Sequence, residues 1–416
     1  MPEFFKLKTT QEVLSVLEVF QPVQTEWVDL TEATGRVLAE DIAVREDIPA
    51  FSRSSMDGYA VRARDTFGAS GSLPALLFVI GEVAMGKTPS SPVGYGQAVR
   101  ISTGGMLPPG ADAVVMVEYS QPLDDRTVEI TRAVSVLENV IQPGDDVKKG
   151  STLLREGKVL RPQDVGLLAG LGMEKAPVYR KVRTAIISTG DELVPVGETP
   201  FPGQVRDINS YTLGGLVRMM GAVPFYLGIV PDSFDLLRAK VEEGLIQADI
   251  ILLSGGSSVG VRDFTVRVFE TFPGSEMLVH GVSVKPGKPT IVARLGNKAL
   301  CGLPGHATSA MVIFSVFVRP LILRMSGGNP EGGNYFTVKA ILERNLESSG
   351  GREDYVRVKL MRTSDGLLAR PVFGKSGLIS TMVEADGLVC IDREAEGLYQ
   401  GEEVDVMLFD GFSGGV

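Results

Sequence analysis

The chain begins with apolar positions at helical spacing, which predict a helix that starts at a capping box of Thr9 and Glu12 and ends before Pro22. From Tyr59 to Val134 the apolar positions instead form short β-rich runs separated by Gly/Pro turns, which predicts a β-rich region. A further helix is expected over Gln163–Gly170, where a proline occupies the first turn. The predicted strands of the β-rich region are Leu76–Ile80, Ala98–Ile101, Ala113–Val117 and Thr127–Thr131.

Strands and helices alternate between residues 182 and 325, and this order predicts right-handed βαβ units around a mostly parallel sheet covered on both faces. From Phe336 to Leu408 the pattern is β-rich again, which indicates a small barrel or a sandwich. The expected fold is therefore multidomain, α/β plus β. The expected α/β elements are strands at Val182–Ile187, Val223–Ile229, Asp249–Leu253, around Val282 and at Thr290–Ala299, and helices at Ser210–Met220, Phe234–Ile246, Phe264–Thr271 and Ser309–Met325.

The composition is that of a globular protein, because 44% of the 416 residues are apolar and 22% are charged. The longest apolar stretch, Met311 to Val318, is far shorter than the ~20 residues that a bilayer span needs. The N-terminus lacks the layout of a secretory signal. Cys301 and Cys390 are too far apart in sequence to form a local motif, so we expect a reducing, cytoplasmic environment.

The net charge of −10 argues against general attraction to nucleic acid or to an anionic membrane, and neither is expected as a partner. Any anion must therefore be bound by a local cluster of donors. His280 and His306 are the two histidines of the chain, so a zinc site has few ligands to draw on. A bound metal is expected to be a hard cation held by carboxylates, namely Mg²⁺.

Four loops at the predicted carboxyl ends of the α/β strands carry glycines, hydroxyls and lysines. Glycines let a ligand approach the backbone, and exposed N–H groups attract anions. Each loop alone is more often an ordinary turn, and either lysine alone is more often solvated. Four of them on one edge of a sheet predict a site for a phosphorylated, multiply anionic small molecule. The loops are Ser188-Thr189-Gly190-Asp191-Glu192, Ser254-Gly255-Gly256-Ser257-Ser258-Val259-Gly260, Lys285-Pro286-Gly287-Lys288-Pro289 and Gly302-Leu303-Pro304-Gly305-His306.

Three acidic residues, Glu192, Asp232 and Asp263, follow strand ends beside these loops. The simpler interpretation is structural, since Asp232 or Ser233 would be the N-cap of the next helix, Asp being a favoured N-cap, and Glu192 and Asp263 fit solvated helix starts. The functional interpretation is that the carboxylates hold Mg²⁺, which bridges them to phosphate oxygens. Lysines, amides and carboxylates together are what a phosphoanhydride-cleaving site requires.

Over nearly its whole length the chain resembles the molybdopterin molybdenumtransferase family, which is related to the gephyrin E domain. The four loops described above carry part of this resemblance. The other matching motifs are Ser55-Met56-Asp57-Gly58-Tyr59-Ala60, Thr103-Gly104-Gly105, Pro108-Pro109-Gly110-Ala111-Asp112-Ala113-Val114-Val115 and Gly144-Asp145-Asp146.

The resemblance implies a transferase of molybdenum cofactor biosynthesis, which inserts molybdate into adenylylated molybdopterin with Mg²⁺-assisted release of AMP. It implies a homodimer with shared active sites and transient contact with the molybdopterin adenylyltransferase. It also implies four domains, the third with the molybdopterin-binding fold and the last a β-barrel. The expected domains are 1–45 with 141–178, 46–140, 179–327 and 328–416.

The resemblance also implies roles for individual residues. The catalytic positions would be Asp57, Thr103, Asp146, Glu192, Asp232 and Asp263, with Asp57 and Thr103 reaching across from the other chain, and Glu192, Asp232 and Asp263 as metal ligands. The substrate-binding positions would be Thr189, Gly190, Ser254, Gly255, Gly256, Ser258, Lys285, Lys288, Pro304, Gly305, His306, Arg357 and Ser376.

Departures from the family pattern cluster near the expected anion site. Gly281 stands in place of a lysine, Arg206 in place of a tyrosine, and Ile141-Gln142-Pro143 in place of arginines. His306-Ala307 replaces Asn-Pro; His306 could supply charge, although a neutral donor replacing asparagine is the simpler interpretation. These changes leave two alternatives open, a tungstate-inserting enzyme of the same fold and a non-catalytic binding or scaffold protein.

Overall fold

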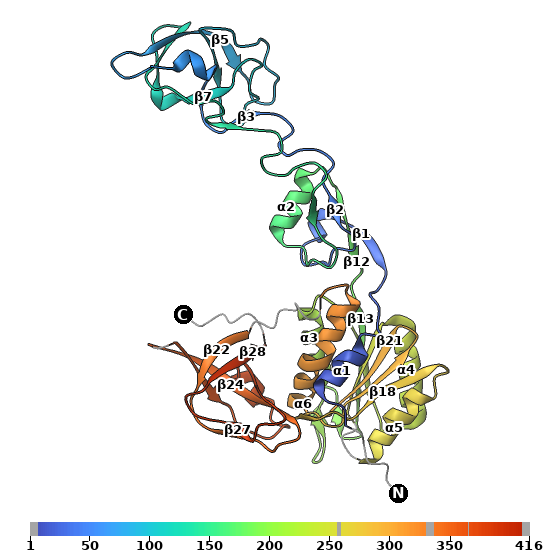
Figure 1. The fold of residues 1–416 in the computed structure, drawn as a ribbon. Helices are drawn as coiled ribbons and strands as arrows, with labels where there is room; N and C mark the ends of the chain where they lie inside the picture. Colours follow the sequence, from blue (N-terminus) through green and yellow to red (C-terminus); the bar gives the residue numbers. More distant parts are fainter. Residues whose placement is uncertain (1–6, 256–258, 330–336, 365, 410–416) are drawn as a thin grey trace. The chain divides into compact units, whose positions relative to one another are not determined.

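The computed structural model describes residues 7–255, 259–329, 337–364 and 366–409, with the side chains of 259–263 also left undescribed. The chain forms two compact units, which are drawn in Figure 1. The small unit is Asp41–Arg155, and the large unit is Met1–Glu40 together with Glu156–Val416. The small unit is therefore an insertion in the sequence of the large one.

A six-stranded sheet in the order β7-β4-β6-β5-β9-β8 forms the centre of the small unit. Its pairings are antiparallel except for β5 with β6. β4 (Gly58–Val61) is buried on both faces, with Tyr59 and Val61 in one core cluster and Ala60 in another. The expected strands are confirmed. The remaining elements are β2 (Ile42–Ala43), β3 (Arg53–Ser54), η2 (Ala63–Thr66), β5 (Ala75–Val83), β6 (Gln97–Ile101), β7 (Ala113–Met116), η3 (Val117–Tyr119), β8 (Ser120–Pro122), β9 (Thr127–Ile130), β10 (Val140–Ile141) and β11 (Thr152–Leu154).

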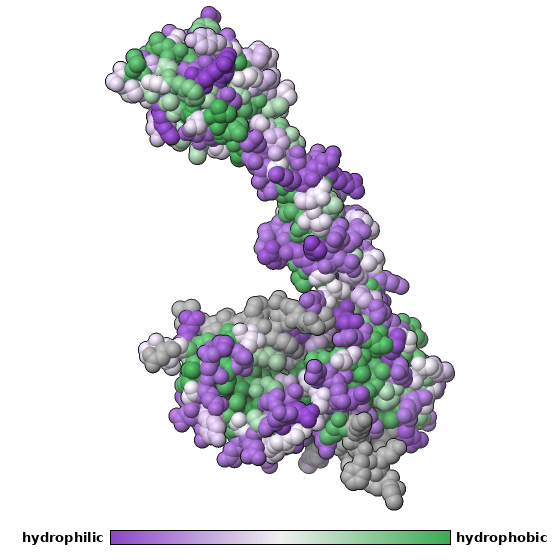
Figure 2. Space-filling model, in the orientation of Figure 1, coloured by the Kyte–Doolittle hydropathy of each residue, from purple (hydrophilic) through white to green (hydrophobic). Residues whose placement is uncertain are grey.

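Apolar residues also reach the surface of the small unit, where Figure 2 shows them among polar ones. Phe67, Leu73 and Leu76 are more than half exposed, at 64%, 71% and 59%. Single exposed apolar side chains are normal on a folded domain.

The N-terminal segment of the large unit contributes α1 (Thr10–Leu17), β1 (Thr25–Asp29) and η1 (Leu30–Glu32). The capping box is present, because the Thr9 hydroxyl accepts from the Glu12 backbone N–H and the Glu12 carboxylate accepts from the Thr9 N–H. β1 pairs antiparallel with β12 (Lys175–Tyr179), and α2 (Pro162–Gly170) begins with proline at its first turn, as expected.

The α/β part of the large unit is built on a sheet in the order β16-β13-β17-β21-β20-β18. The first four strands are parallel and the last two pairings are antiparallel, which confirms a mostly parallel sheet. Helices cover both faces (Figure 1). The elements are β13 (Arg183–Thr189), β14 (Leu193–Val194), β15 (Val205–Arg206), α3 (Asn209–Met219), β16 (Val223–Val230), α4 (Phe234–Gln247), β17 (Ile250–Gly255), α5 (Val259–Glu270), β18 (Ser275–His280), β19 (Val284–Lys285), β20 (Ile291–Leu295), β21 (Lys298–Leu303), α6 (Ala307–Ile313), the π-helical η4 (Phe314–Val318) and α7 (Arg319–Met325).

Each face of this sheet has its own apolar core. One core joins α1, α3 and the helix from Ala307 to Met325 to the sheet, with Phe314 and Phe317 almost fully buried. The other joins α4 and α5 to the opposite face. β17 has a continuous apolar run because it lies at the centre of the sheet and is buried on both faces.

Two expectations for the end of this sheet are wrong. The strand expected around Val282 is β18, which ends earlier, and Val282 makes only an isolated bridge to Lys8. The single strand expected over Thr290–Ala299 is the hairpin of β20 and β21. Gly296, at a φ of 59°, and the residue after it form the two-residue turn, a Gly-Asn pair that favours this geometry.

A closed five-stranded barrel follows the α/β part, because β24 pairs with both β25 and β26 in the series β24-β25-β22-β28-β26. The sequence left barrel and sandwich open, and the closed pairing decides for the barrel. β19 pairs in parallel with β24, so a strand of the barrel is hydrogen-bonded to the α/β part. The elements are β22 (Thr337–Leu342), β23 (Leu346–Glu347), β24 (Glu353–Thr363), β25 (Gly366–Pro371), α8 (Ser380–Glu384), β26 (Gly387–Ile391), β27 (Gly397–Leu398) and β28 (Glu403–Leu408).

The helix from Ala307 to Met325 is the one segment of the described residues long and apolar enough to span a membrane by length and composition. Its most apolar window is 67% buried inside the protein, which is typical of a core helix. The continuous apolar stretch noted in the sequence is only the middle part of it.

Candidate active site

The polar edge of the α/β sheet begins where β13 and β17 end side by side. Their parallel register places Ser188 opposite Ser254 and Thr189 opposite Gly255. The Ser188 hydroxyl donates to Asp207 Oδ1 at 2.9 Å and lies 3.1 Å from the Ser210 hydroxyl. These polar side chains are buried, so the edge is a fixed hydrogen-bonded network.

Gly255 occupies a position that a larger residue cannot take. Its φ is +139°, and a Cβ there would lie 2.0 Å from the backbone carbonyl oxygen of Thr189. Gly190 has a φ of +155°, and a Cβ there would lie 2.6 Å from Glu192 Oε2. The strand-end glycines therefore allow a close approach of backbone and carboxylate that any side chain would prevent.

Three carboxylates gather at the end of β13 and β16. The Thr189 hydroxyl donates to Asp232 Oδ1 at 2.8 Å, and the Asp232 backbone N–H donates to Asp191 Oδ1 at 3.1 Å. Burial raises the pKa of Asp232 above its usual value, the Thr189 hydrogen bond opposes this, and the charges of Asp191 and Glu192 raise it further. A cation bound here would relieve this crowding of negative charge.

The structural interpretations of two of these acids are wrong. The N-cap position of α4 is taken by Ser233, and the Asp232 carboxylate accepts from Thr189 instead of capping the helix. Glu192 precedes the short strand β14 and is not at a helix start. Neither carboxylate therefore caps or begins a helix.

The remaining predicted residues of these loops are only partly visible. Gly256 and Ser258 lie outside the described residues, and so does the side chain of Asp263, whose backbone belongs to α5. Within the part of the chain that the structure describes, no three His, Cys, Asp or Glu side chains form a metal-binding group. Mg²⁺ commonly takes only one or two carboxylates together with substrate phosphates, so Asp232 and its neighbours fit it in donor type.

The lysine-bearing loop reaches the same edge of the sheet. Ile291 at the start of β20 pairs with Gly302 near the end of β21, so residues 285–290 lie where the parallel strands end. Lys285 Nζ donates to Asp354 Oδ2 at 2.5 Å, and Lys288 is exposed. The edge thus carries both carboxylates and cations.

The barrel contributes two of the predicted substrate-binding residues. Arg357 donates from Nη1 to the Thr381 hydroxyl at 2.8 Å and from Nη2 to the Gly374 carbonyl at 2.7 Å. Burial lowers the pKa of Arg357, while the charge of Asp354 opposes that effect. Ser376 Oγ lies 2.8 Å from His306 Nδ1, so the residue that departs from the family pattern links the α/β part to the barrel.

The loop before α6 is held by a buried proline and by a hydrogen bond from α3. Pro304 is buried, and the Gly305 carbonyl accepts from Asn209 Nδ2 at 2.8 Å. Asn209 begins α3, two residues after the Asp207 that accepts from Ser188. The hydrogen bonds of α3 therefore hold two of the predicted loops.

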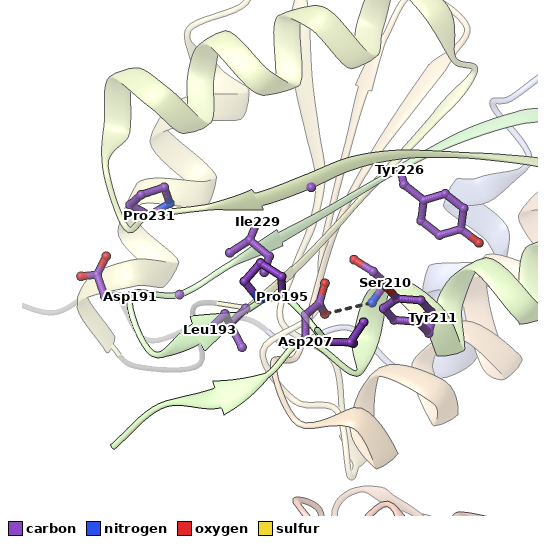
Figure 3. Close-up of a pocket in the computed structure, with 12 residues that line it drawn as sticks. Asp191, Leu193, Pro195, Asp207, Ser210, Tyr211, Tyr226, Ile229 and Pro231 are labelled. Atoms are coloured by element: carbon purple, nitrogen blue, oxygen red, sulfur yellow. Dashed lines mark hydrogen bonds between the residues drawn. The ribbon is translucent and has the colours of Figure 1, made fainter. Parts of the chain in front are cut away.

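A pocket of about 750 Å³ opens beside this edge, lined by the Gly190-Asp191 turn, β14, the start of α3 and the end of β16. Figure 3 shows Asp191 and Pro231 at one end and Tyr211 and Tyr226 at the other. Tyr226 packs on Gly214 of α3, where a Cβ would lie 2.1 Å from its hydroxyl oxygen. The aromatic end suits a planar ring, and the loop end suits phosphate.

Arg206, the second residue that departs from the family pattern, shapes the wall of this pocket. Its Nε lies 3.1 Å from the carbonyl oxygens of both Val196 and Glu198. Its Nε therefore fastens the turn that follows β14. A guanidinium carries five N–H donors, so this contact does not use all of them.

The small unit holds the other predicted catalytic residues. Asp57 Oδ1 accepts from the Thr103 backbone N–H at 2.7 Å and from its hydroxyl at 3.2 Å, so these two side chains are brought together. Asp146 is exposed on the segment that follows Gly144, and its backbone N–H donates to the Ile48 carbonyl. All three are available to a ligand or to a second chain.

Sequence reasoning missed Asp207, the two tyrosines of the pocket and Asp354. Asp207 could have been found, because it stands three residues before Ser210 at the start of a predicted helix, as a capping residue does. Asp354 has no such signal, since its importance depends on a strand pairing between residues 69 positions apart.

The sequence matches three family descriptions in order along the chain. Residues 8–172 match "MoeA N-terminal region (domain I and II)", residues 185–324 match "Probable molybdopterin binding domain", and residues 339–409 match "MoeA C-terminal region (domain IV)".

Similar proteins are found among curated relatives and solved structures. The chain is 34% identical over 389 residues to the molybdopterin molybdenumtransferase of Bacillus subtilis, covering 92% of this chain and 90% of the relative. It is 35% identical over 396 residues to that of Haemophilus influenzae, covering 94% and 95%. The crystal structure of a molybdopterin biosynthesis MoeA protein from Pyrococcus horikoshii is similar with a TM-score of 0.84 and 37% identity, covering 98% of this chain and all of that one. With full-length relatives above 30% identity, the chain belongs to the MoeA family of molybdopterin molybdenumtransferases.

Proposed function

We propose that this protein inserts molybdate into adenylylated molybdopterin and releases AMP, giving the molybdenum cofactor. The observation that carries the proposal is that carboxylates and lysines both lie at one edge of the sheet. Asp232, held by Thr189 beside Asp191, lies at the ends of β13 and β16, while Lys285 and Lys288 lie where β21 ends. Cleavage of a phosphoanhydride requires a metal ion, which the carboxylates can hold. Binding of an oxyanion requires positive charge, which the lysines supply.

We assign the organic substrate to the pocket beside this edge. We assign its planar end to the side of Tyr211 and Tyr226, where a ring can stack on an aromatic face. The phosphates then lie at the Gly190-Asp191 turn, where a glycine backbone gives phosphate oxygens room to approach. Ser254 and Gly255, the last residues of β17, lie at the neighbouring strand end.

Mg²⁺ would be held by Asp232 and Glu192, with Asp263 as a third candidate. The negative charge that raises the pKa of Asp232 supports this assignment. When bound, Mg²⁺ neutralises charge on the phosphate oxygens and on the departing AMP.

The protein's own groups would orient the reacting parts. Thr189 fixes the Asp232 carboxylate, and Asp207 fixes the Ser188 hydroxyl at the adjoining strand end. Molybdate would be held by Lys285 and Lys288, with Arg357, Ser376 and His306 as further donors. His306 Nδ1 and Ser376 Oγ lie within hydrogen-bond distance, so these two groups would act from one place.

The alternatives receive no comparable support. Curated relatives over 90% or more of their length are named for molybdenum, so tungstate insertion is not favoured. A purely non-catalytic scaffold would have no need of Asp232 and Glu192 crowded beside Gly190, and the chain retains both.

We further propose that the protein acts as a cytoplasmic homodimer with shared sites. A second copy would supply Asp57, Thr103 and Asp146, and the molybdopterin adenylyltransferase would hand over the adenylylated substrate in a transient contact. The expected four domains, 1–45 with 141–178, 46–140, 179–327 and 328–416, stay part of this proposal. The discontinuous first domain accords with a small unit inserted into the sequence of the large one.

The test is a reaction of purified full-length protein with adenylylated molybdopterin, molybdate and Mg²⁺. AMP and active cofactor are expected together, chelation of divalent cations should stop both, and added Mg²⁺ should restore them. A matched pair of variants sharpens the result. Asp232→Asn should raise the Mg²⁺ requirement about tenfold or more, whereas Asp235→Asn, an acidic residue on the first turn of α4, should not. Absence of AMP under saturating substrates, or equal Mg²⁺ requirements in both variants, contradicts the proposal.

A further inference from the structure

Lys285 and Asp354 face each other across the junction between the α/β part and the barrel. They are opposite partners in the parallel pairing of β19 with β24, and Lys285 Nζ lies 2.5 Å from Asp354 Oδ2. The Glu353 backbone N–H donates to the Ser283 carbonyl at 2.9 Å, so the backbone holds the same register. The lysine's position is thus set by a strand of a different fold.

The two side chains differ sharply in exposure. The Asp354 side chain is 5% exposed and that of Lys285 is 46% exposed. A buried carboxylate is costly unless it is paired, and Asp354 is satisfied by the Lys285 ammonium and by the Ser348 hydroxyl at 3.2 Å. The ion pair holds the ammonium group of Lys285 in one position. Its ammonium has three donors, so one contact with Asp354 leaves two for a ligand.

Asp354 also acts electrostatically on Arg357, a cation of the barrel itself. Its charge counters the burial that lowers the pKa of Arg357, three residues later on β24. Arg357 is held in place by its own hydrogen bonds to Thr381 and Gly374. Lys285 is therefore the residue whose position depends on Asp354.

We propose that Asp354 is the positioning residue of the oxyanion site, which holds the Lys285 ammonium in place so that its free donors meet molybdate. This inference rests on the proposed function, because it takes Lys285 as a molybdate-binding residue. The carboxylate itself does not touch the substrate. Without it, Lys285 is a flexible surface side chain that loses conformational entropy on binding.

The experiment measures AMP release by the full-length protein against molybdate concentration. Asp354→Asn keeps the shape and removes the charge, and it should raise the molybdate KM about tenfold, the loss of one charge-assisted hydrogen bond. The kcat and the KM for adenylylated molybdopterin should stay within about twofold. A merely structural residue would change all three.

A matched control lies next to it on the strand. The Glu353 carboxylate accepts from the Tyr355 hydroxyl at 2.9 Å and from Thr10, not from Lys285. Glu353→Gln should therefore leave the molybdate KM within about twofold of the unmodified protein. If it raises that KM as much as Asp354→Asn does, the effect comes from the strand and the inference fails.

A double-mutant cycle decides whether Asp354 acts through Lys285. Lys285→Gln should raise the molybdate KM, and adding Asp354→Asn to it should change that KM less than about twofold. Additive effects overturn the inference. If Asp354→Asn does not fold, Ser348→Ala, which removes the neutral partner of the same carboxylate, should still raise the KM about threefold; no rise overturns it.

The same cycle separates this inference from the proposed function. If Lys285→Gln raises the molybdate KM and Asp354→Asn does not, the oxyanion site stands and the role of Asp354 falls. If Lys285→Gln leaves the molybdate KM unchanged while AMP is still released, Lys285 is not in the oxyanion site, and both assignments are wrong.

Discussion

The Thr189 hydroxyl donates to the carboxylate of Asp232 across 2.8 Å, joining the ends of two parallel strands that are 43 residues apart in sequence. Thr189 is almost fully buried, and Asp232 is half-buried beside two further acidic residues. The hydroxyl is the one contact that favours the ionised form of Asp232 among those that shift its pKa. It therefore lowers the pH at which this carboxylate ionises and becomes able to hold a cation.

Replacing Thr189 with valine should move the acid limb of the activity profile to higher pH. Ionised Asp232 is the form that binds Mg²⁺, so activity falls as pH drops through its pKa, which burial and neighbouring charge already raise. Removing the hydroxyl raises that pKa further. Rates measured near the acid limb should fall about three- to tenfold. Thr189→Ser keeps the hydroxyl and should restore the profile; an unmoved limb in the valine variant would sink the idea.

Gly255→Ala should destabilise the fold and abolish turnover. The added Cβ would lie 2.0 Å from the Thr189 carbonyl oxygen at a φ of +139°, so the strand end must shift. We expect a loss of about 2–4 kcal/mol in the free energy of unfolding, measured by denaturant titration. Gly215→Ala is the matched control, because nothing lies within 4 Å of its Cβ and it sits in α3. It should instead stabilise by about 0.5–1 kcal/mol.

His306→Asn should leave the molybdate KM and kcat within about threefold of their original values, at about pH 6 as well as at about pH 8. Asparagine keeps a polar group within reach of Ser376, which the histidine contacts at 2.8 Å. Steady-state kinetics at both pH values measure this directly. A selective loss in the variant at the lower pH would show that His306 binds the oxyanion as a cation, the interpretation that we do not favour.

Two inactive variants should restore activity when mixed, if the sites are shared between two chains. At a Mg²⁺ concentration that supports the unmodified protein but not Asp232→Asn, the Asp57→Asn and Asp232→Asn homodimers would each be inactive at both sites. After unfolding and refolding together, half of the dimers carry both kinds of chain, and each of these has one intact site. About a quarter of full activity should return. No recovery, in a sample whose mixed dimers are confirmed by mass spectrometry, would place all these residues of one site on a single chain.

Most of the fold follows from the spacing of apolar residues. The βαβ order was predictable because β17 reads as a buried apolar run and α4 as a helix between two strands. The hairpin of β20 and β21 was missed because its two strands form one continuous β-rich run, interrupted only by Gly296 and the asparagine after it. A single residue pair of this kind is easily read as part of a strand.

The site was predictable only as far as its residues lie in local motifs. The glycine and hydroxyl residues of the loops after β13 and β17 can be found from sequence, because strand ends of a parallel sheet meet at one edge. Partnerships cannot be found in this way. The contact of Lys285 with Asp354 depends on register between two folds, and that of His306 with Ser376 spans 70 residues.

The N-terminal helix α1 has a consequence for the order in which the protein can fold during synthesis. Val13, Leu17 and Phe20 are buried in the same core as Ile186, Phe314 and Leu321, which leave the ribosome some 170 to 300 residues later. The apolar face of α1 therefore stays exposed to solvent while the small unit is synthesised and forms its own sheet. Contacts of such high sequence separation predict slow closure of the large unit and a need for protection of α1 on the nascent chain.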